Sequence, residues 1–176
     1  MRRKDRRALA ALFALALVLA ATYAGTAPAP GATPVTGPYP VVKVVDGDTL
    51  DVMKDGERVR VRLIGINAPE SVDPNRPVQC FGKEASAELA RMATGQMVAL
   101  ETDPSQDTYD RYGRLLAYVF ASTTNLNLHM IEAGYAYEYT YDLPYKYQRE
   151  FRAAQREAQA AGRGLWAAGA CGNRVQ

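Results

Sequence analysis

Four short segments of this chain contain the residue types that chemistry on a phosphodiester requires. They are Asp46–Thr49, Arg62, Asn67–Glu70 and Asp110–Arg114. Asp48 and Glu70 supply carboxylate oxygens, which are the ligands that a hard cation such as Ca²⁺ prefers. Arg62 and Arg114 supply guanidinium groups, which make paired hydrogen bonds to phosphate oxygens. Together these groups predict metal-assisted hydrolysis of a phosphodiester.

Each chemical role has a simpler alternative. Glu70 can orient or deprotonate an attacking water, and Arg114 can neutralise the charge that develops on the phosphate. Taken singly, Arg62 and Glu70 are ordinary solvated residues, and Asp46–Thr49 is a hairpin turn. Arg111 either shapes the turn before Arg114 or contacts substrate. The chemical interpretation therefore depends on the joint occurrence of these residues.

The segments around these residues alternate apolar and polar side chains, as half-buried strands do. In the third of them, Arg58, Arg60 and Arg62 share one face and the aliphatic residues between them share the other. Asp55–Gly56 suits a tight hairpin turn before this strand. The expected strands are Val41–Val45, Thr49–Lys54, Glu57–Ile64, Gln96–Glu101 and Leu115–Ala121. Five short strands predict a small closed barrel of the OB type.

Three further segments repeat apolar residues at helical spacing. They are Gly82–Thr94, Leu126–Ala133 and Tyr145–Ala161. Strands interrupted and followed by helices predict an α+β fold, a five-stranded OB-fold β-barrel with about three α-helices. The only histidine, His129, falls in the second helix, where we expect a packed or surface residue rather than a catalytic base.

The first 24 residues have the pattern of a secretory signal peptide, with a basic start, the apolar run Ala8–Ala21 and small residues after it. We expect cleavage after Ala24; a retained membrane anchor is the alternative. Residues 25–38, rich in Pro, Ala and Thr, predict a linker. Residues 39–168 form the expected domain, and residues 169–176 a tail. Such a protein is secreted or held in the cell envelope, and it contacts a membrane only if the leader is retained.

Removal of the leader changes the charge of the protein. The whole chain has 21 Lys+Arg and 19 Asp+Glu, a net charge of +2. The leader holds five of the basic residues and one of the acidic residues, which leaves 16 against 18, a net charge of −2. Bulk charge therefore gives no support for nucleic-acid binding, and any such binding must depend on local residues.

The chain contains two cysteines, Cys80 and Cys171, which lie far apart in the sequence. In an exported protein they predict one disulfide that ties the C-terminal tail to the segment before the first helix. Closing a loop of this length contributes on the order of 4 kcal/mol in the chain-entropy description. Two free thiols are the alternative. Two cysteines and one histidine do not make a typical zinc site.

Read together, these motifs closely resemble the thermonuclease family in their order along the chain. The segments that carry the resemblance are Asp46–Thr49, Arg62–Glu70, Gly82–Ser86, Asp110–Tyr118 and the ending Gly164–Trp166. The match runs from about Val42 to Trp166. It implies an OB-fold barrel with helices and a Ca²⁺-dependent nuclease that hydrolyses DNA and RNA and leaves 3′-phosphates.

The resemblance also implies roles for individual residues. Arg62, Glu70 and Arg114 fall on the catalytic positions of the family. Asp48, Asn67 and Glu70 fall on or near its metal site, with the carbonyl of Ala68 as a further ligand for one Ca²⁺ ion. The family has aspartate where this chain has Asn67. Because an amide oxygen brings no negative charge, we predict weaker Ca²⁺ binding or a different metal preference, with activity retained.

Six tyrosines follow the second expected helix. They are Tyr135, Tyr137, Tyr139, Tyr141, Tyr145 and Tyr147. Tyrosines can stack on the bases of a single strand, or they can pack in the protein with their hydroxyls reaching water. The resemblance places substrate-contacting tyrosines in this stretch, and we assign Tyr139 and Tyr141 to substrate binding, together with Arg111 and Tyr112.

The main functional hypothesis is thus an exported nuclease, a monomer that takes DNA and RNA as substrates with single strands preferred. The rival is a non-catalytic OB-fold module that binds nucleic acid and has a weakened metal site. Asn67 and the acidic mature charge favour the rival, whereas the presence of both arginines with Glu70 favours the nuclease. A third hypothesis is a secreted protein-interaction domain without affinity for nucleic acid.

Overall fold

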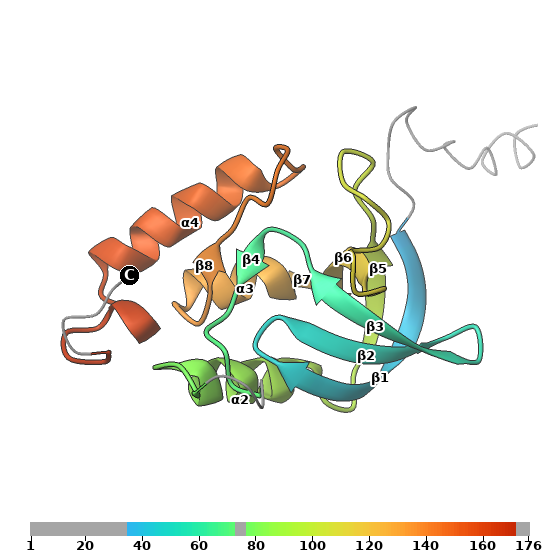
Figure 1. Cartoon of the computed structure of the whole chain (residues 1–176), viewed down its shortest axis with the longest axis horizontal. Helices are drawn as coiled ribbons and strands as arrows, with labels where there is room; N and C mark the ends of the chain where they lie inside the picture. Colours follow the sequence, from blue (N-terminus) through green and yellow to red (C-terminus); the bar gives the residue numbers. More distant parts are fainter. Residues whose placement is uncertain (1–34, 73–76, 172–176) are drawn as a thin grey trace, which may run out of the picture. The chain divides into compact units, whose positions relative to one another are not determined.

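The computed structural model describes residues 35–72 and 77–171 (Figure 1). The strands are β1 (Val35–Asp46), β2 (Thr49–Lys54), β3 (Glu57–Leu63), β4 (Ile66–Asn67), β5 (Met97–Glu101), β6 (Leu115–Ala121), β7 (Thr124–Asn125) and β8 (Tyr137–Glu138). The helices are α2 (Gly82–Ala93), α3 (Leu126–Glu132), α4 (Gln148–Ala160) and the 3₁₀ turn η2 (Gly164–Trp166). The predicted signal peptide, most of the linker and the end of the tail lie outside the described residues.

Five strands close into a barrel. They pair in the order β3-β2-β1-β5-β6, and a parallel pairing between β3 and β6 closes the ring. Strand β1 serves two neighbours, because its first half pairs with β5 and its second half with β2. Figure 1 shows β1 curving past both strands. The predicted five-stranded barrel with three helices is therefore confirmed.

Alternation along the strands fills the barrel with aliphatic side chains. Leu50 and Val52 of β2 are fully buried, as are Val61 and Leu63 of β3. The β2–β3 hairpin turns at Asp55, whose φ of 53° lies in the left-handed region that aspartate tolerates. Each buried aliphatic side chain of this size contributes on the order of 2 kcal/mol. The outer face of β3 is left to its arginines.

The helices pack by apolar stripes, as their spacing predicts. Helix α4 buries Phe151, Ala154 and Ala158. Asn125 caps the start of helix α3, since its side chain accepts a hydrogen bond from the N–H of Leu128 at 3.2 Å. Figure 1 shows α4 lying beside α3 and β8, and α2 beside β1. No helix among the described residues combines the length and apolar character that crossing a membrane needs.

Buried Asn127 of α3 links this helix to the strands that carry the site. Its Oδ1 accepts the N–H of Val119 at 2.9 Å, and its Nδ2 donates to the carbonyl of Ile64 at 2.9 Å. Because Ile64 follows β3 and Val119 lies in β6, one side chain joins both strands of the parallel pair. The ends of β3 and β6 are therefore held in register.

Three local features differ from the sequence-based expectations. Strand β1 begins at Val35, because residues that read as linker pair with β5, for example Thr36 with Leu100. Helix α4 begins at Gln148, after the buried Tyr145. The two-residue strands β4 and β8 have no periodicity to predict them, since they form only through mutual pairing.

The predicted disulfide is present. Cys80 and Cys171 are joined across 91 positions of sequence, with their Cα atoms 5.5 Å apart.

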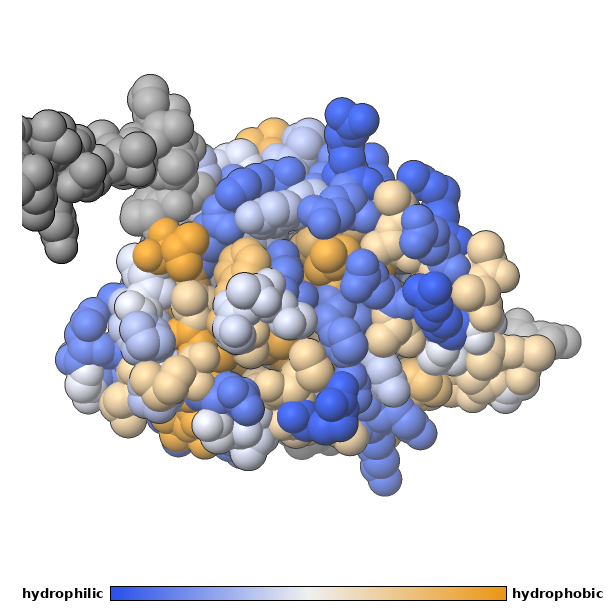
Figure 2. Space-filling view, turned by 180° about the vertical axis from the view of Figure 1, so that it is seen from behind, coloured by the Kyte–Doolittle hydropathy of each residue, from blue (hydrophilic) through white to orange (hydrophobic). Residues whose placement is uncertain are grey.

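The face seen in Figure 2 is largely hydrophilic, with hydrophobic residues in small separate patches.

Candidate active site

Asp48 is the buried acceptor at the centre of the site, and its position follows from the turn between β1 and β2. Gly47 is required in that turn, because a Cβ there would lie 2.6 Å from the Cβ of Ala68. Asp46 shapes the turn by accepting the N–H of Asp48 at 3.0 Å. The Asp48 carboxylate, 6 % exposed, accepts the hydroxyl of Thr49 and the N–H of Ala68, both at 2.9 Å.

Arg62 comes from the end of β3 and faces Asp48. Its Nη2 lies 3.0 Å from Asp48 Oδ2 and 3.4 Å from Asn67 Oδ1. Its Nη1 donates to the carbonyl of Leu63 at 2.6 Å. With three partners and only 13 % exposure, the guanidinium is held in one orientation.

Burial and the charge of Asp48 raise the pKa of the neighbouring Asp46 to about 6.

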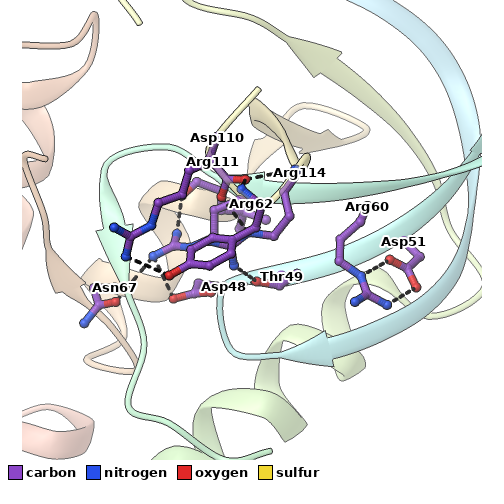
Figure 3. Close-up of polar contacts among 11 residues, drawn as sticks. Asp48, Thr49, Asp51, Arg60, Arg62, Asn67, Asp110, Arg111 and Arg114 are labelled. Carbon is purple, nitrogen blue, oxygen red and sulfur yellow. Dashed lines mark hydrogen bonds and ion pairs between the residues drawn. The ribbon is translucent and has the colours of Figure 1, made fainter. Parts of the chain in front are cut away.

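Arg114 is positioned by its own turn. Asp110 Oδ1 accepts the N–H groups of Tyr112 and Arg114 at 2.9 Å each, and its Oδ2 accepts from Arg114 Nε at 2.6 Å. Burial alone would raise the pKa of Asp110, but these hydrogen bonds lower it below its usual value. Arg114 Nη1 reaches Thr49 Oγ1 at 3.5 Å. Thr49 therefore stands between Asp48 and Arg114 (Figure 3).

The two arginines meet because β3 and β6 are parallel neighbours, with Arg62 paired to Leu116 two residues after Arg114. They line a cleft of about 610 Å³. Arg111, Tyr112, Tyr139 and Tyr141 line the same cleft, as does Asn67. Figure 3 shows Arg62, Arg111 and Arg114 grouped above Asp48 and Thr49.

The aromatic wall of the cleft is exposed. Tyr112 is 66 % and Tyr141 76 % exposed. Arg111 lies over the Tyr112 ring, with its guanidinium carbon 4.8 Å from the ring centroid, and it also donates to the Tyr112 hydroxyl at 2.7 Å. The six-tyrosine stretch divides, because Tyr137 packs on Trp166 and Tyr145 is buried. Tyr137 and Tyr145 therefore pack within the protein, whereas Tyr139 and Tyr141 line the cleft and their contact with substrate stays a prediction.

Glu70 is not among the residues that line the cleft. Its Oε1 accepts the N–H of Val72 at 2.8 Å. Its backbone is held by Gln79, whose Oε1 accepts the Glu70 N–H at 2.9 Å and whose N–H donates to the Glu70 carbonyl at 2.8 Å. Ala68 presents its N–H to Asp48. The structure thus brings Asp48, Arg62, Asn67 and Arg114 together and places Glu70 on the adjoining loop.

Sequence reasoning missed three contributors to this region. The Thr49 hydroxyl links Asp48 to Arg114, and the Asp-Gly-Asp-Thr motif contained that signal. Gln79 holds the Glu70 backbone by two hydrogen bonds, and nothing in the sequence around Gln79 indicates this contact. The loop at 104–107 forms one side of the cleft, and its contribution depends on tertiary contacts.

Comparison with known proteins shows the family of this chain. Residues 60–168 match the model of the family described as "Staphylococcal nuclease homologue". The chain belongs to the staphylococcal nuclease family. It is 44 % identical to the thermonuclease of Staphylococcus hyicus over 128 residues, which cover 73 % of this chain and 75 % of that protein. The thermonuclease of Staphylococcus intermedius is 42 % identical with the same coverage.

A more distant member of the staphylococcal nuclease family is endonuclease YncB of Bacillus subtilis. It is 33 % identical over 125 residues, which cover 70 % of this chain and 59 % of that protein. The part of the chain that matches the family model contains Arg62, Glu70 and Arg114, whereas Asp48 and Thr49 precede it.

The oxygen atoms of the site fit a Ca²⁺ ion by type. Asp48 Oδ2 and Asn67 Oδ1 both face the same nitrogen of Arg62, so one cation already lies against both oxygens. Carboxylate and amide oxygens are ligands of a hard cation. Among the described residues, no three acidic, histidine or cysteine side chains gather at one point. The site therefore suits Ca²⁺ and supplies little negative charge to hold it.

Proposed function

We propose that this protein is an exported, Ca²⁺-dependent nuclease that hydrolyses phosphodiester bonds of DNA and RNA and leaves 3′-phosphates. Relatives named thermonuclease and endonuclease support the nuclease part of the proposal. The dependence on Ca²⁺, the choice of DNA and RNA and the export are further proposals, supported by the donor set and by the leader sequence.

A single observation carries the proposal. Two guanidinium groups, one from the end of β3 and one from the turn before β6, converge on one buried carboxylate, since Arg62 contacts Asp48 directly and Arg114 reaches it through Thr49. A phosphate that enters the cleft meets hydrogen-bond donors whose positions are already fixed. Fixed donors stabilise the charge that develops in the transition state without reorganisation.

The residues divide the chemistry among them. Arg62 and Arg114 bind the non-bridging oxygens of the scissile phosphate and offset the charge that accumulates on them. Glu70, on the adjoining loop, orients and deprotonates the attacking water. Asp48 and Asn67, with Glu70 and the Ala68 carbonyl, hold the metal. Bound Ca²⁺ supplies a Lewis acid for a phosphate oxygen.

The exposed aromatic side chains support a preference for single strands. Tyr112, Tyr139 and Tyr141 present their rings at the cleft. Bases stack on such rings when they are not paired, at about 1–3 kcal/mol per base. We therefore propose that single-stranded DNA and RNA are cut faster than duplexes, by a monomer.

The test is digestion of DNA by the chain from residue 27 onward, with Ca²⁺ and with chelator. We expect cleavage only with Ca²⁺, and a loss of about 10²-fold or more in kcat for Arg114→Ala. Arg149→Ala, on the exposed face of α4, is the matched control. Absence of Ca²⁺-dependent cleavage, or a wild-type rate for Arg114→Ala, would contradict the proposal. Binding of DNA without cleavage would support the non-catalytic OB module instead.

A further inference from the structure

The arginine of the cleft is the last of a row of three on β3. Arg58, Arg60 and Arg62 alternate along the strand, so their side chains share one face. The register of the hairpin places Arg60 opposite Asp51 and Arg58 opposite Met53. Arg62 lines the cleft and has its role there. Arg58 and Arg60 have no role in the chemistry described above.

Both of these arginines bind one carboxylate. Arg58 Nη2 lies 2.5 Å and Arg60 Nε 2.8 Å from the two oxygens of Asp51. Asp51 is 1 % exposed, whereas each arginine side chain is 50 % exposed. Burial alone would raise the pKa of Asp51, but the two guanidinium groups lower it, so the cluster keeps one net positive charge.

The Asp51 carboxylate holds the two guanidinium groups in place and leaves part of each open to solvent. A guanidinium has five N–H donors, and only some of them face the carboxylate. The buried Asp51 carboxylate needs one neutralising partner, which a single arginine supplies, so the second guanidinium exceeds what neutralisation requires. The cluster is therefore a preorganised pair of anion-binding groups.

The pair is aligned with the cleft. Figure 3 shows Arg60 and Asp51 on β3 and β2, beside the group formed by Arg62, Arg114 and Asp48. Alternate residues of a strand are about 6.6 Å apart, which is comparable to the spacing of neighbouring phosphates along an extended nucleic-acid strand. A strand whose scissile phosphate lies at Arg62 can continue along β3 over Arg60 and Arg58.

We propose that Arg58 and Arg60 form an extended phosphate-binding track, which holds the backbone of a single-stranded nucleic acid beyond the bond that is cut. The track rests on the proposed function for the position of the scissile phosphate. It makes the protein favour long strands over dinucleotides, although the mature chain carries no net positive charge.

The experiment compares wild type with R58Q/R60Q and with the control R149Q/R156Q, which removes two exposed arginines of α4. Binding of a fluorescent 12-residue oligothymidylate is measured in chelator, where no cleavage occurs, over a range of salt. We expect R58Q/R60Q to bind about tenfold more weakly, with a salt dependence reduced by about 1.4 in slope. In R58Q/R60Q we also expect the ratio of the KM for the 12-mer to the KM for dithymidylate to rise by a similar factor.

A second variant is expected to change binding in the opposite direction. D51N keeps both arginines and removes the neutralising charge, so we expect tighter binding of the 12-mer; circular dichroism confirms that each variant is folded. Equal binding by R58Q/R60Q and the control, or weaker binding by folded D51N, would overturn the track. A wild-type chain that binds the 12-mer through these arginines but does not cut it would refute the nuclease and leave the track standing.

Discussion

Arg62 is the residue that joins the candidate metal ligands to the phosphate-binding groups. Its guanidinium lies against both Asp48 and Asn67. A divalent cation that binds these two oxygens shares them with Arg62. We therefore expect the charge at position 67 to set how well a metal ion competes with Arg62 for Asp48.

For this reason we expect Asn67→Asp to lower the Ca²⁺ concentration that gives half-maximal activity, by about tenfold, because calcium sites tune affinity by the number of charged ligands. Titrating activity against Ca²⁺ in both proteins measures this. Gln159→Glu, at an exposed position of α4, adds the same charge away from the site. Identical calcium curves for wild type and Asn67→Asp would show that position 67 does not contact the metal.

Gln79 is a positioning residue for Glu70, since it makes two hydrogen bonds to the Glu70 backbone. We expect Gln79→Ala to lower kcat by about tenfold, as loss of a supporting partner behind a site residue does. Gln79→Glu retains an acceptor oxygen for the Glu70 N–H and should recover most of the activity. Steady-state kinetics with pH profiles distinguish this role from simple destabilisation, which would affect both variants alike.

At the scale of elements, Glu88 joins α2 to α3. It is 9 % exposed, and its Oε1 lies 2.6 Å from Arg91 Nη2 and 2.7 Å from His129 Nε2. The hydrogen bond from Arg91, and then that from His129, lowers the pKa of Glu88 to about 2 despite its burial. His129 thus has a structural partner, in agreement with its expected role as a packed or surface residue.

Because the pKa of Glu88 is lower in the folded protein than its ordinary 4.5, its ionised form stabilises the fold above that pH. This stabilisation is on the order of 2 kcal/mol, a value reduced because Arg91 is exposed and solvent screens its charge. It is lost as the pH falls from about 4.5 towards 2. Urea unfolding at pH 7 and pH 3 should show a smaller acid loss in Glu88→Gln than in wild type. The exposed Glu157→Gln should lose as much stability between pH 7 and pH 3 as wild type does. An equal acid loss in Glu88→Gln and wild type would exclude this stabilisation.

The elements show which parts of a fold can be predicted locally. Strands β2 and β6 have the predicted bounds, because turn residues flank an alternating run in β2 and a continuous apolar run in β6. The first half of β1 was not predicted, since Gly37 and Pro38 read as linker and its partner β5 is distant in the sequence. The same limit applies to the site: motifs identified Asp48, Arg62 and Arg114, whereas the bracing by Gln79 exists only in the folded chain.

At the scale of the whole molecule, the disulfide fastens the end of the described chain to the segment that precedes α2. It joins Cys171 to the residue directly after Gln79, so it also restrains the end of the loop that begins at Glu70. The link spans most of the domain, and its main effect is to limit the conformations of the unfolded chain.

We therefore expect Cys80→Ser with Cys171→Ser to lower the free energy of unfolding by about 2–4 kcal/mol. Urea titration followed by the fluorescence of Trp166 measures the change. Wild type treated with a thiol reductant should match the double variant, and the variant itself should not respond to the reductant. An unchanged unfolding midpoint in the double variant would mean that the disulfide does not stabilise the domain.

The parallel pairing of β3 with β6 has a consequence for when the protein can act. Arg62 lies in β3 and Arg114 directly precedes β6, so this pairing between distant parts of the chain is what brings them to one cleft. Because closing long loops has an entropic cost, we expect the pairing to form late in folding. A chain still under synthesis, or one kept unfolded, has both arginines but no place where they meet. We therefore expect nuclease activity to appear only when the fold is complete, so that an unfinished chain leaves the nucleic acid around it uncut.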